Sequence, residues 1–102
     1  MATDSSWLVY MLRCADNSLY TGVTTDLDRR VDEHNTSPRD AKYTRNRRPV
    51  FPVYCEQFET RSEAQKRERE IKKFDKVTKE GLAETYLAKA KKRKPRIAKK
   101  TS

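Results

Sequence analysis

The sequence predicts an α+β fold, a small three-stranded antiparallel β-sheet flanked by helices, followed by a disordered basic C-terminal tail. Three observations lead to this prediction: two apolar segments joined by a short turn, later segments with apolar residues at helical spacing, and a concentration of basic residues at the end. A chain of 102 residues has room for one core. We therefore expect one domain over residues 1–90 and a tail over 91–102.

The first two strands are predicted at residues 7–14 and 19–23, which are rich in apolar, aromatic and β-branched side chains. The residues between them have turn chemistry. If the loop is three residues long and ends on Asn17, which tolerates the left-handed conformation, Tyr10 faces Gly22 across the hairpin. Tyr10 and Tyr20 then lie diagonally adjacent on one face of the sheet.

A helix is predicted over about residues 26–35. Thr25, followed three residues later by Asp28, resembles a capping box with a shortened acid. The face of this helix that should meet the core contains two apolar and two polar residues at the spacing i, i+3, i+4, i+7: Leu27, Arg30, Val31 and His34.

The third strand is predicted at about residues 50–58, after a polar loop. Pro49 and Pro52 restrict it to an edge position or a late start, because proline cannot donate a ladder hydrogen bond. A second helix, capped by Thr60 or Ser62, should run to about residue 74.

The apolar stripe of that second helix passes through Ala64 and Ile71, and Glu68 falls on it. A third helix is expected to start at Thr78 and to continue into the basic tail.

The charge of the chain is concentrated at its end. Lys and Arg number 24 and Asp and Glu 15, for a net charge of +9, and residues 88–102 contain eight basic and no acidic side chains. Such a tail attracts polyanions, and nucleic acid is favoured because no apolar face accompanies the charges as membrane binding would need. A solvated tail that aids solubility is the alternative.

Several protein classes are excluded at this stage. No run approaches the roughly 18 apolar residues of a membrane span, and the N-terminus lacks the layout of a signal peptide. One histidine and two distant cysteines, Cys14 and Cys55, cannot form a usual four-ligand zinc site. We expect reduced thiols in a cytoplasmic protein, associated with the nucleoid if it is bacterial.

Three polar residues occupy positions where apolar ones are expected: Arg30, His34 and Glu68. A buried charge without a partner costs several kcal/mol, so each needs one. One interpretation is an Arg30–Glu68 ion pair that joins two helices. The other is a polar site for phosphodiester hydrolysis, in which a carboxylate holds a divalent cation, an arginine neutralises charge and a third group removes a proton from water.

The order of these motifs resembles the GIY-YIG nuclease domain. The resemblance rests on Leu8-Val9-Tyr10, Tyr20-Thr21-Gly22, the segment 26–31 with His34, and Glu68 in the segment 62–73. It is strongest to small stand-alone bacterial proteins of the YhbQ type and more distant to the N-terminal domain of the UvrC repair nuclease. It covers about residues 7–74.

The resemblance implies a divalent-metal-dependent DNA endonuclease, structure-preferring and linked to DNA repair or processing. It implies Tyr10 and Tyr20 as the paired tyrosines, Arg30 as the phosphate-directed arginine, His34 in proton relay and Glu68 as the single ligand of one Mg²⁺ or Mn²⁺ ion. Whether Tyr10 or Tyr20 is the general base stays open. DNA, branched or single-stranded, is the expected partner ahead of RNA, no membrane is involved, and the oligomeric state is not predicted.

The loop before the third strand mixes one aromatic with several basic residues, a composition that suits phosphate contacts and stacking on an unpaired base. A solvated loop is the alternative. The predicted nucleic-acid-binding residues are Lys42, Tyr43, Thr44, Arg45, Arg47 and Arg48.

Two departures from the family pattern support a second hypothesis. Val23 stands where many members have Lys, and no Asn follows Asn46. The chain would then be a non-catalytic nucleic-acid-binding module of the same fold. An RNA-associated accessory protein is a third hypothesis, suggested by size and charge.

Overall fold

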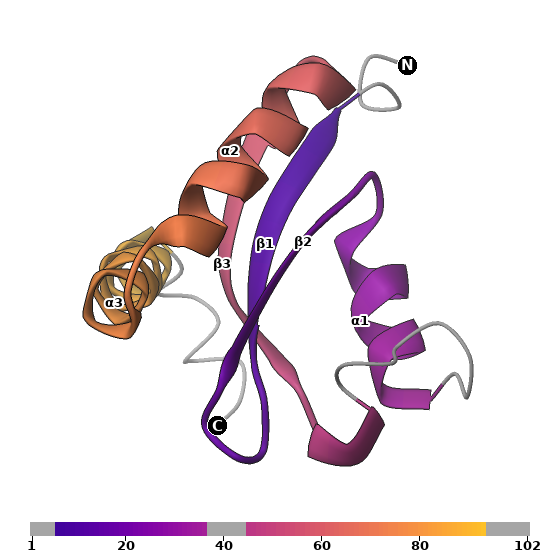
Figure 1. Ribbon diagram of the computed structural model, residues 1–102, viewed down its shortest axis with the longest axis vertical. Helices are drawn as coiled ribbons and strands as arrows, with labels where there is room; N and C mark the ends of the chain where they lie inside the picture. The colour runs from indigo at the N-terminus through magenta and orange to yellow at the C-terminus, as the bar shows by residue number, and fades with distance from the viewer. Residues whose placement is uncertain (1–5, 37–44, 94–102) are drawn as a thin grey trace.

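The computed structural model describes residues 6–36 and 45–93, which form a three-stranded sheet and helices on both of its faces (Figure 1). The elements are β1 (Trp7–Arg13), β2 (Leu19–Thr24), α1 (Leu27–Thr36), the 3₁₀-helix η2 (Arg45–Arg47), β3 (Phe51–Phe58), α2 (Arg61–Lys73) and α3 (Lys76–Arg93). The strand order is β2-β1-β3 with both pairings antiparallel. Helix α1 covers one face, and α2 and α3 cover the other. The predicted fold class is confirmed.

The β1–β2 hairpin has the predicted register. Tyr10 pairs with Gly22, and Leu12 pairs with Tyr20. Asn17 is the one non-glycine residue with a positive φ among the described residues, at 72°, and so provides the left-handed position that the three-residue loop needs. The two tyrosines consequently lie on the same face, toward α1.

Strand β3 lies at the edge of the sheet, as its prolines predicted. The pairing of β1 with β3 shifts between Met11 and Leu12, which pair with Tyr54 and Pro52. Val53 is therefore an extra residue on β3, and the β-bulge takes up the ladder position that Pro52 disturbs.

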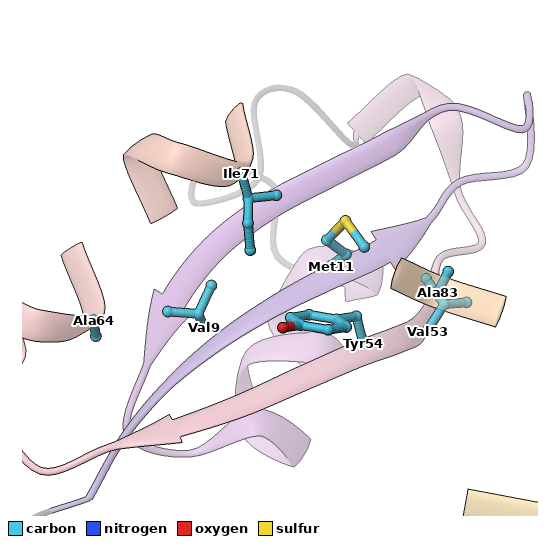
Figure 2. Packing of buried hydrophobic residues seen from close by; sticks show 7 residues of the cluster. All are labelled: Val9, Met11, Val53, Tyr54, Ala64, Ile71 and Ala83. Carbon is cyan, nitrogen blue, oxygen red and sulfur yellow. The ribbon is translucent and has the colours of Figure 1, made fainter. Parts of the chain in front are cut away.

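The main core lies between the sheet and the pair α2 and α3. Val9 and Met11 of β1 meet Ile71 of α2, as Figure 2 shows, and all three side chains are fully buried. The remaining buried members of this cluster are Val53, Tyr54, Ala64 and Ala83. Thr60 is the N-cap of α2, its side chain accepting from the backbone N–H of Glu63, as one of the two predicted alternatives required.

The starts of α1 and α3 differ from the prediction. Asp26, rather than a Thr25–Asp28 box, caps α1, because its Oδ1 accepts from the backbone N–H of Arg29 at 3.1 Å. Asp75 caps α3 in the same way, through Thr78 N–H at 2.8 Å, so α3 begins at Lys76. In both helices the carboxylate one position before the helix accepts a hydrogen bond from a backbone N–H that has no partner within the helix. Its negative charge also interacts favourably with the positive N-terminal end of the helix dipole.

Helix α3 runs to Arg93 and so continues three residues into the segment that was predicted as tail. Residues 94–102 lie outside the described part of the chain. Within the described part, none of the helices is long and apolar enough to cross a membrane. Cys14 and Cys55 are both free thiols, and burial raises the pKa of each.

Candidate active site

The centre of the candidate site is a buried contact between Tyr10 of β1 and His34 of α1. The Tyr10 hydroxyl lies 3.1 Å from His34 Nε2, and each residue is only 1% exposed. Strand β2 makes this contact possible, because Gly22 has no side chain where the Tyr10 ring passes over it; a Cβ at Gly22 would lie 2.5 Å from the Tyr10 hydroxyl oxygen. The hairpin register thus determines how Tyr10 reaches α1.

Tyr20 completes an aromatic group with these two residues. Its ring centroid lies 4.9 Å from that of His34 and 6.3 Å from that of Tyr10, and the His34 contact is edge-to-face. Tyr20 is half-buried, whereas Tyr10 is enclosed. The less buried tyrosine is therefore the one that a solvent molecule reaches more readily.

Arg30 stands one turn before His34 on the same helix. Its Nη1 lies 2.8 Å from the Glu33 carboxylate, which also faces Arg29 at 3.8 Å. A hydrogen bond between the Arg30 guanidinium and Tyr10 is one of the influences that lower the pKa of Tyr10. Arg30 therefore connects Tyr10 to the Glu33 carboxylate, which was not predicted as part of the site.

Glu68 lies on α2, which packs on the face of the sheet opposite α1. Burial is the largest cause of the raised pKa of Tyr10, and the negative charge of Glu68 is one of the smaller influences in the same direction. Its ion-pair partner in the described structure is Lys72, at 3.0 Å, and not Arg30. The interpretation of an Arg30–Glu68 ion pair that joins two helices is therefore wrong.

Burial shifts the pKa values of the two central residues in opposite directions. It raises the pKa of Tyr10 to about 12, against a hydrogen bond from Arg30 that lowers it, and with added contributions from Tyr20 and Glu68. Burial, followed by the positive charge of Arg30, lowers the pKa of His34 to about 4. At neutral pH both groups are uncharged, and Nε2 of His34 can accept the Tyr10 proton in the tautomer that carries its hydrogen on Nδ1.

The end of α1 that carries His34 is tied to the segment before β3. Arg48 Nε donates to the backbone carbonyl of His34 at 2.7 Å. The Asn35 side chain accepts from Val50 N–H at 2.8 Å and donates to Val50 C=O at 3.2 Å, so it pairs with the backbone as a neighbouring strand would. These contacts hold the His34 ring against Tyr10.

The predicted nucleic-acid-binding loop is described in part. Lys42, Tyr43 and Thr44 lie outside the described residues, and the backbone of Arg45 starts η2. Arg47 Nε contacts Asp16 Oδ2 at 3.0 Å, and Arg47 C=O accepts from Ala15 N–H at 2.8 Å. The described part of the loop therefore packs on the tip of the hairpin, with Arg48 directed to His34.

Glu68 is the site residue whose side chain could be a ligand of a divalent cation. The described residues contain no group of three or more His, Cys, Asp or Glu side chains that could hold a metal ion. Mg²⁺ commonly binds one or two carboxylates and completes its octahedron with water and substrate phosphate oxygens. The half-buried Glu68 carboxylate is a donor of this kind, whereas a tetrahedral zinc site needs more protein ligands.

Three residues near the site, Glu33, Lys72 and Asn35, were not predicted, and Arg48 was predicted to bind nucleic acid but not to contact His34. Glu33 and Lys72 lie one helical turn from Arg30 and Glu68, a spacing that is visible in the sequence and predicts side-chain contact. The Asn35 bridge and the Arg48 contact join segments that are 15 and 14 residues apart, and no local pattern indicates them.

In a comparison with models of protein families, residues 6–81 match the family described as GIY-YIG catalytic domain. The match includes Tyr10, Tyr20, Arg30, His34 and Glu68.

The chain is also similar to individual proteins named UPF0213. The UPF0213 protein of Desulfotalea psychrophila is 52% identical over 77 residues, which are 76% of this chain and 70% of the relative. The UPF0213 protein of Haloquadratum walsbyi is 55% identical over 76 residues, covering 74% of this chain and 84% of its own.

Among solved structures, the solution structure of an E. faecalis protein matches with a TM-score of 0.57 at 43% identity, covering 86% of this chain and 93% of that one. That of the UPF0213 protein of Bacillus halodurans matches with a TM-score of 0.51 at 42% identity, covering 78% and 84%.

Proposed function

The chain belongs to the GIY-YIG catalytic domain family, a family of nucleases, and from this premise we propose that it is a divalent-metal-dependent endonuclease that hydrolyses phosphodiester bonds in DNA. The observation that supports a catalytic role most directly is the 3.1 Å contact between the buried Tyr10 hydroxyl and His34 Nε2. A protein that only binds nucleic acid has no need for a buried hydrogen bond between a tyrosine and a histidine. Burying these two polar side chains costs free energy unless they bond to each other.

The proposed reaction is attack of water on the phosphorus and departure of one ester oxygen. With a pKa of about 12, Tyr10 holds its proton at neutral pH, so it can accept the proton of the attacking water only if its own proton passes to His34 Nε2 in the same step. Tyr20 is the alternative base, being nearer to solvent, and Tyr10 would then orient the water.

Arg30 neutralises negative charge as it grows on the phosphate oxygens. In the free protein Glu33 lies at its guanidinium, and an incoming phosphate replaces one anion by another. Glu68 is the residue that would hold the metal, and a divalent cation bound there would supply charge neutralisation for the scissile phosphate and the leaving oxygen.

The substrate is proposed to be branched, nicked or single-stranded DNA, in a repair or processing role. The folded part of the chain is small and offers little surface for reading a long base sequence, whereas a structural feature can be recognised through phosphates and one stacked base. The non-catalytic binding module remains the second candidate, supported by Val23 in the place of a family lysine.

The test is cleavage of a panel of branched, nicked and single-stranded DNA and RNA, with Mg²⁺, Mn²⁺ or a chelator. Glu68→Ala should lower cleavage at least ~100-fold because the metal is lost, while binding to DNA persists through Lys and Arg contacts. Glu63→Ala is the matched control, since Glu63 is a solvent-exposed carboxylate on the same helix. No cleavage of any substrate by the wild-type protein, with intact binding, would favour the binding module.

A further inference from the structure

The carboxylate proposed to hold the metal is bound to a lysine in this structure. Lys72 Nζ lies 3.0 Å from Glu68 Oε2, one helical turn along α2. The Glu68 side chain is 21% exposed, whereas that of Lys72 is 53% exposed. The Glu68 carboxylate is therefore the more enclosed member of the pair. The Lys72 ammonium group is more exposed and is attached to the helix by a flexible four-carbon side chain.

Lys72 contacts the carboxylate that the proposed function assigns to the metal. A substrate phosphate held by a metal ion at Glu68 would therefore lie within reach of the flexible Lys72 side chain. A divalent cation at Glu68 and the ammonium of Lys72 cannot both keep their positions, because like charges a few ångströms apart repel each other. Partly exposed pairs of this type are weak and are readily exchanged.

We propose that Lys72 is the counter-ion of Glu68 in the metal-free protein and transfers to a substrate phosphate when a divalent cation takes the carboxylate. This inference rests on the proposed function, because it needs Glu68 to be the metal ligand. It assigns Lys72 two alternating partners, Glu68 and a phosphate of the nucleic acid.

The exchange couples metal and DNA. Each metal ion that binds releases an ammonium group toward the phosphates, and each phosphate that takes the ammonium frees Glu68 for the metal. By linkage, the metal must raise the affinity for DNA by the same factor by which DNA raises the affinity for the metal. Glu68 would then bind the metal more tightly in the presence of DNA than in its absence, which limits metal binding to the protein without substrate.

Helix α2 provides a matched control in Lys73. It has the same charge and is solvent-exposed like Lys72, but the helical rotation of about 100° per residue turns it away from Glu68. Within the described part of the chain it has no ion pair, in contrast to Lys72.

The first measurement is Mn²⁺ binding to the full-length protein without DNA, followed through the electron paramagnetic resonance of free Mn²⁺. Lys72→Met should bind Mn²⁺ more tightly than wild type, by about threefold or more, because its competitor is gone, and Lys73→Met should stay within about 1.5-fold. Glu68→Gln should bind roughly tenfold or more weakly than wild type.

The second measurement is the affinity for a fluorescent single-stranded oligonucleotide with and without Mn²⁺, in a Tyr10→Phe background that slows turnover and with the oligonucleotide checked to be intact after each titration. We expect the gain in affinity on adding Mn²⁺ to be at least about twofold smaller with Lys72→Met than with Lys73→Met. Binding of Mn²⁺ to the oligonucleotide itself is common to both variants and cancels.

The outcomes distinguish a failure of Glu68 as the metal ligand from a failure of the exchange by Lys72. If Glu68→Gln binds Mn²⁺ like wild type, the metal assignment of the proposed function fails, and the role of Lys72 fails with it. If Glu68→Gln loses Mn²⁺ but Lys72→Met matches Lys73→Met in both measurements, the metal site stands and the exchange by Lys72 is wrong.

Discussion

Burial at the Tyr10–His34 contact keeps a tyrosine protonated and a histidine neutral over the same range of pH. The pKa of Tyr10 is raised to about 12 and that of His34 is lowered to about 4, with burial as the largest cause in both cases. The Tyr10 hydroxyl can therefore donate a hydrogen bond to the neutral imidazole at neutral pH. The sequence places His34 on an apolar stripe, but only the packing of α1 on the hairpin determines how deeply it is buried.

His34 is the only histidine in the chain, so its titration can be followed by NMR without assignment. We expect a midpoint near pH 4, well below the ordinary value of 6.5. Because the native state binds this proton less readily than the unfolded state, the free energy of unfolding should fall as pH drops through the window from about 6.5 to about 4. The group's full effect is roughly 3 kcal/mol. A midpoint near 6.5 would show that the ring is solvated and that the relay is not assembled.

At the scale of elements, the three-residue turn fixes the pairing of β1 with β2, and this pairing places Gly22 beneath the Tyr10 hydroxyl. A Cβ there would lie 2.5 Å from the hydroxyl oxygen and 2.7 Å from the ring carbon that bears it. Because the ring is enclosed, it has no free space into which to withdraw. Strand β2 thereby positions a side chain of β1 for a contact with α1.

Gly22→Ala should therefore separate Tyr10 from His34. We expect a loss of about 1–3 kcal/mol in stability from overpacking and a drop in single-turnover cleavage, since Tyr10 has to shift. Gly81→Ala in α3 is the control, with no atom within 4 Å of its new Cβ, and should gain up to about 1 kcal/mol from helix propensity. Denaturant unfolding and cleavage, measured side by side, check both. Wild-type cleavage by Gly22→Ala would contradict this arrangement.

The elements themselves were largely predictable, because their signals are local. The turn at Asn17, the apolar run of β1 and the cap at Thr60 each depend on residues close in sequence, and the hairpin register follows from loop length. The N-caps Asp26 and Asp75 were missed because a threonine stands near each in the sequence, Thr25 and Thr78, and both Thr and Asp serve as N-caps.

The site was harder to predict than the fold. Arg30, His34 and Glu68 stood out as polar residues at core positions, but their partners could not be read from that pattern. Glu33 and Lys72 lie at favourable helical spacing, yet any such pair looks like an ordinary surface ion pair. The Asn35 and Arg48 contacts depend on how the loop returns to β3, which is a tertiary property.

At the scale of the whole molecule, the final residues carry a large share of the net charge. Residues 94–102 contain four basic and no acidic side chains, so their deletion takes the net charge from +9 to +5. Cutting after Arg93 leaves α3 intact. The candidate site residues all lie upstream of this cut.

This truncation should weaken DNA binding for all sequences and structures alike. We expect a shallower plot of log affinity against log salt, because fewer counterions are released, and unchanged single-turnover cleavage at saturating DNA. A salt titration beside a cleavage assay measures both. An unchanged salt slope would mean that these residues do not contact the phosphate backbone.

In the proposed reaction the Tyr10 hydroxyl passes a proton to His34 during hydrolysis. This role of Tyr10 is tested by the single-turnover cleavage rate of Tyr10→Phe at saturating DNA and Mg²⁺, because the change removes one oxygen atom and keeps the buried ring. We predict a loss of about 100-fold or more, the usual contribution of general acid–base catalysis, with DNA affinity within about twofold of wild type. Cleavage by Tyr10→Phe at the wild-type rate would contradict the claim and would transfer the role of base to Tyr20.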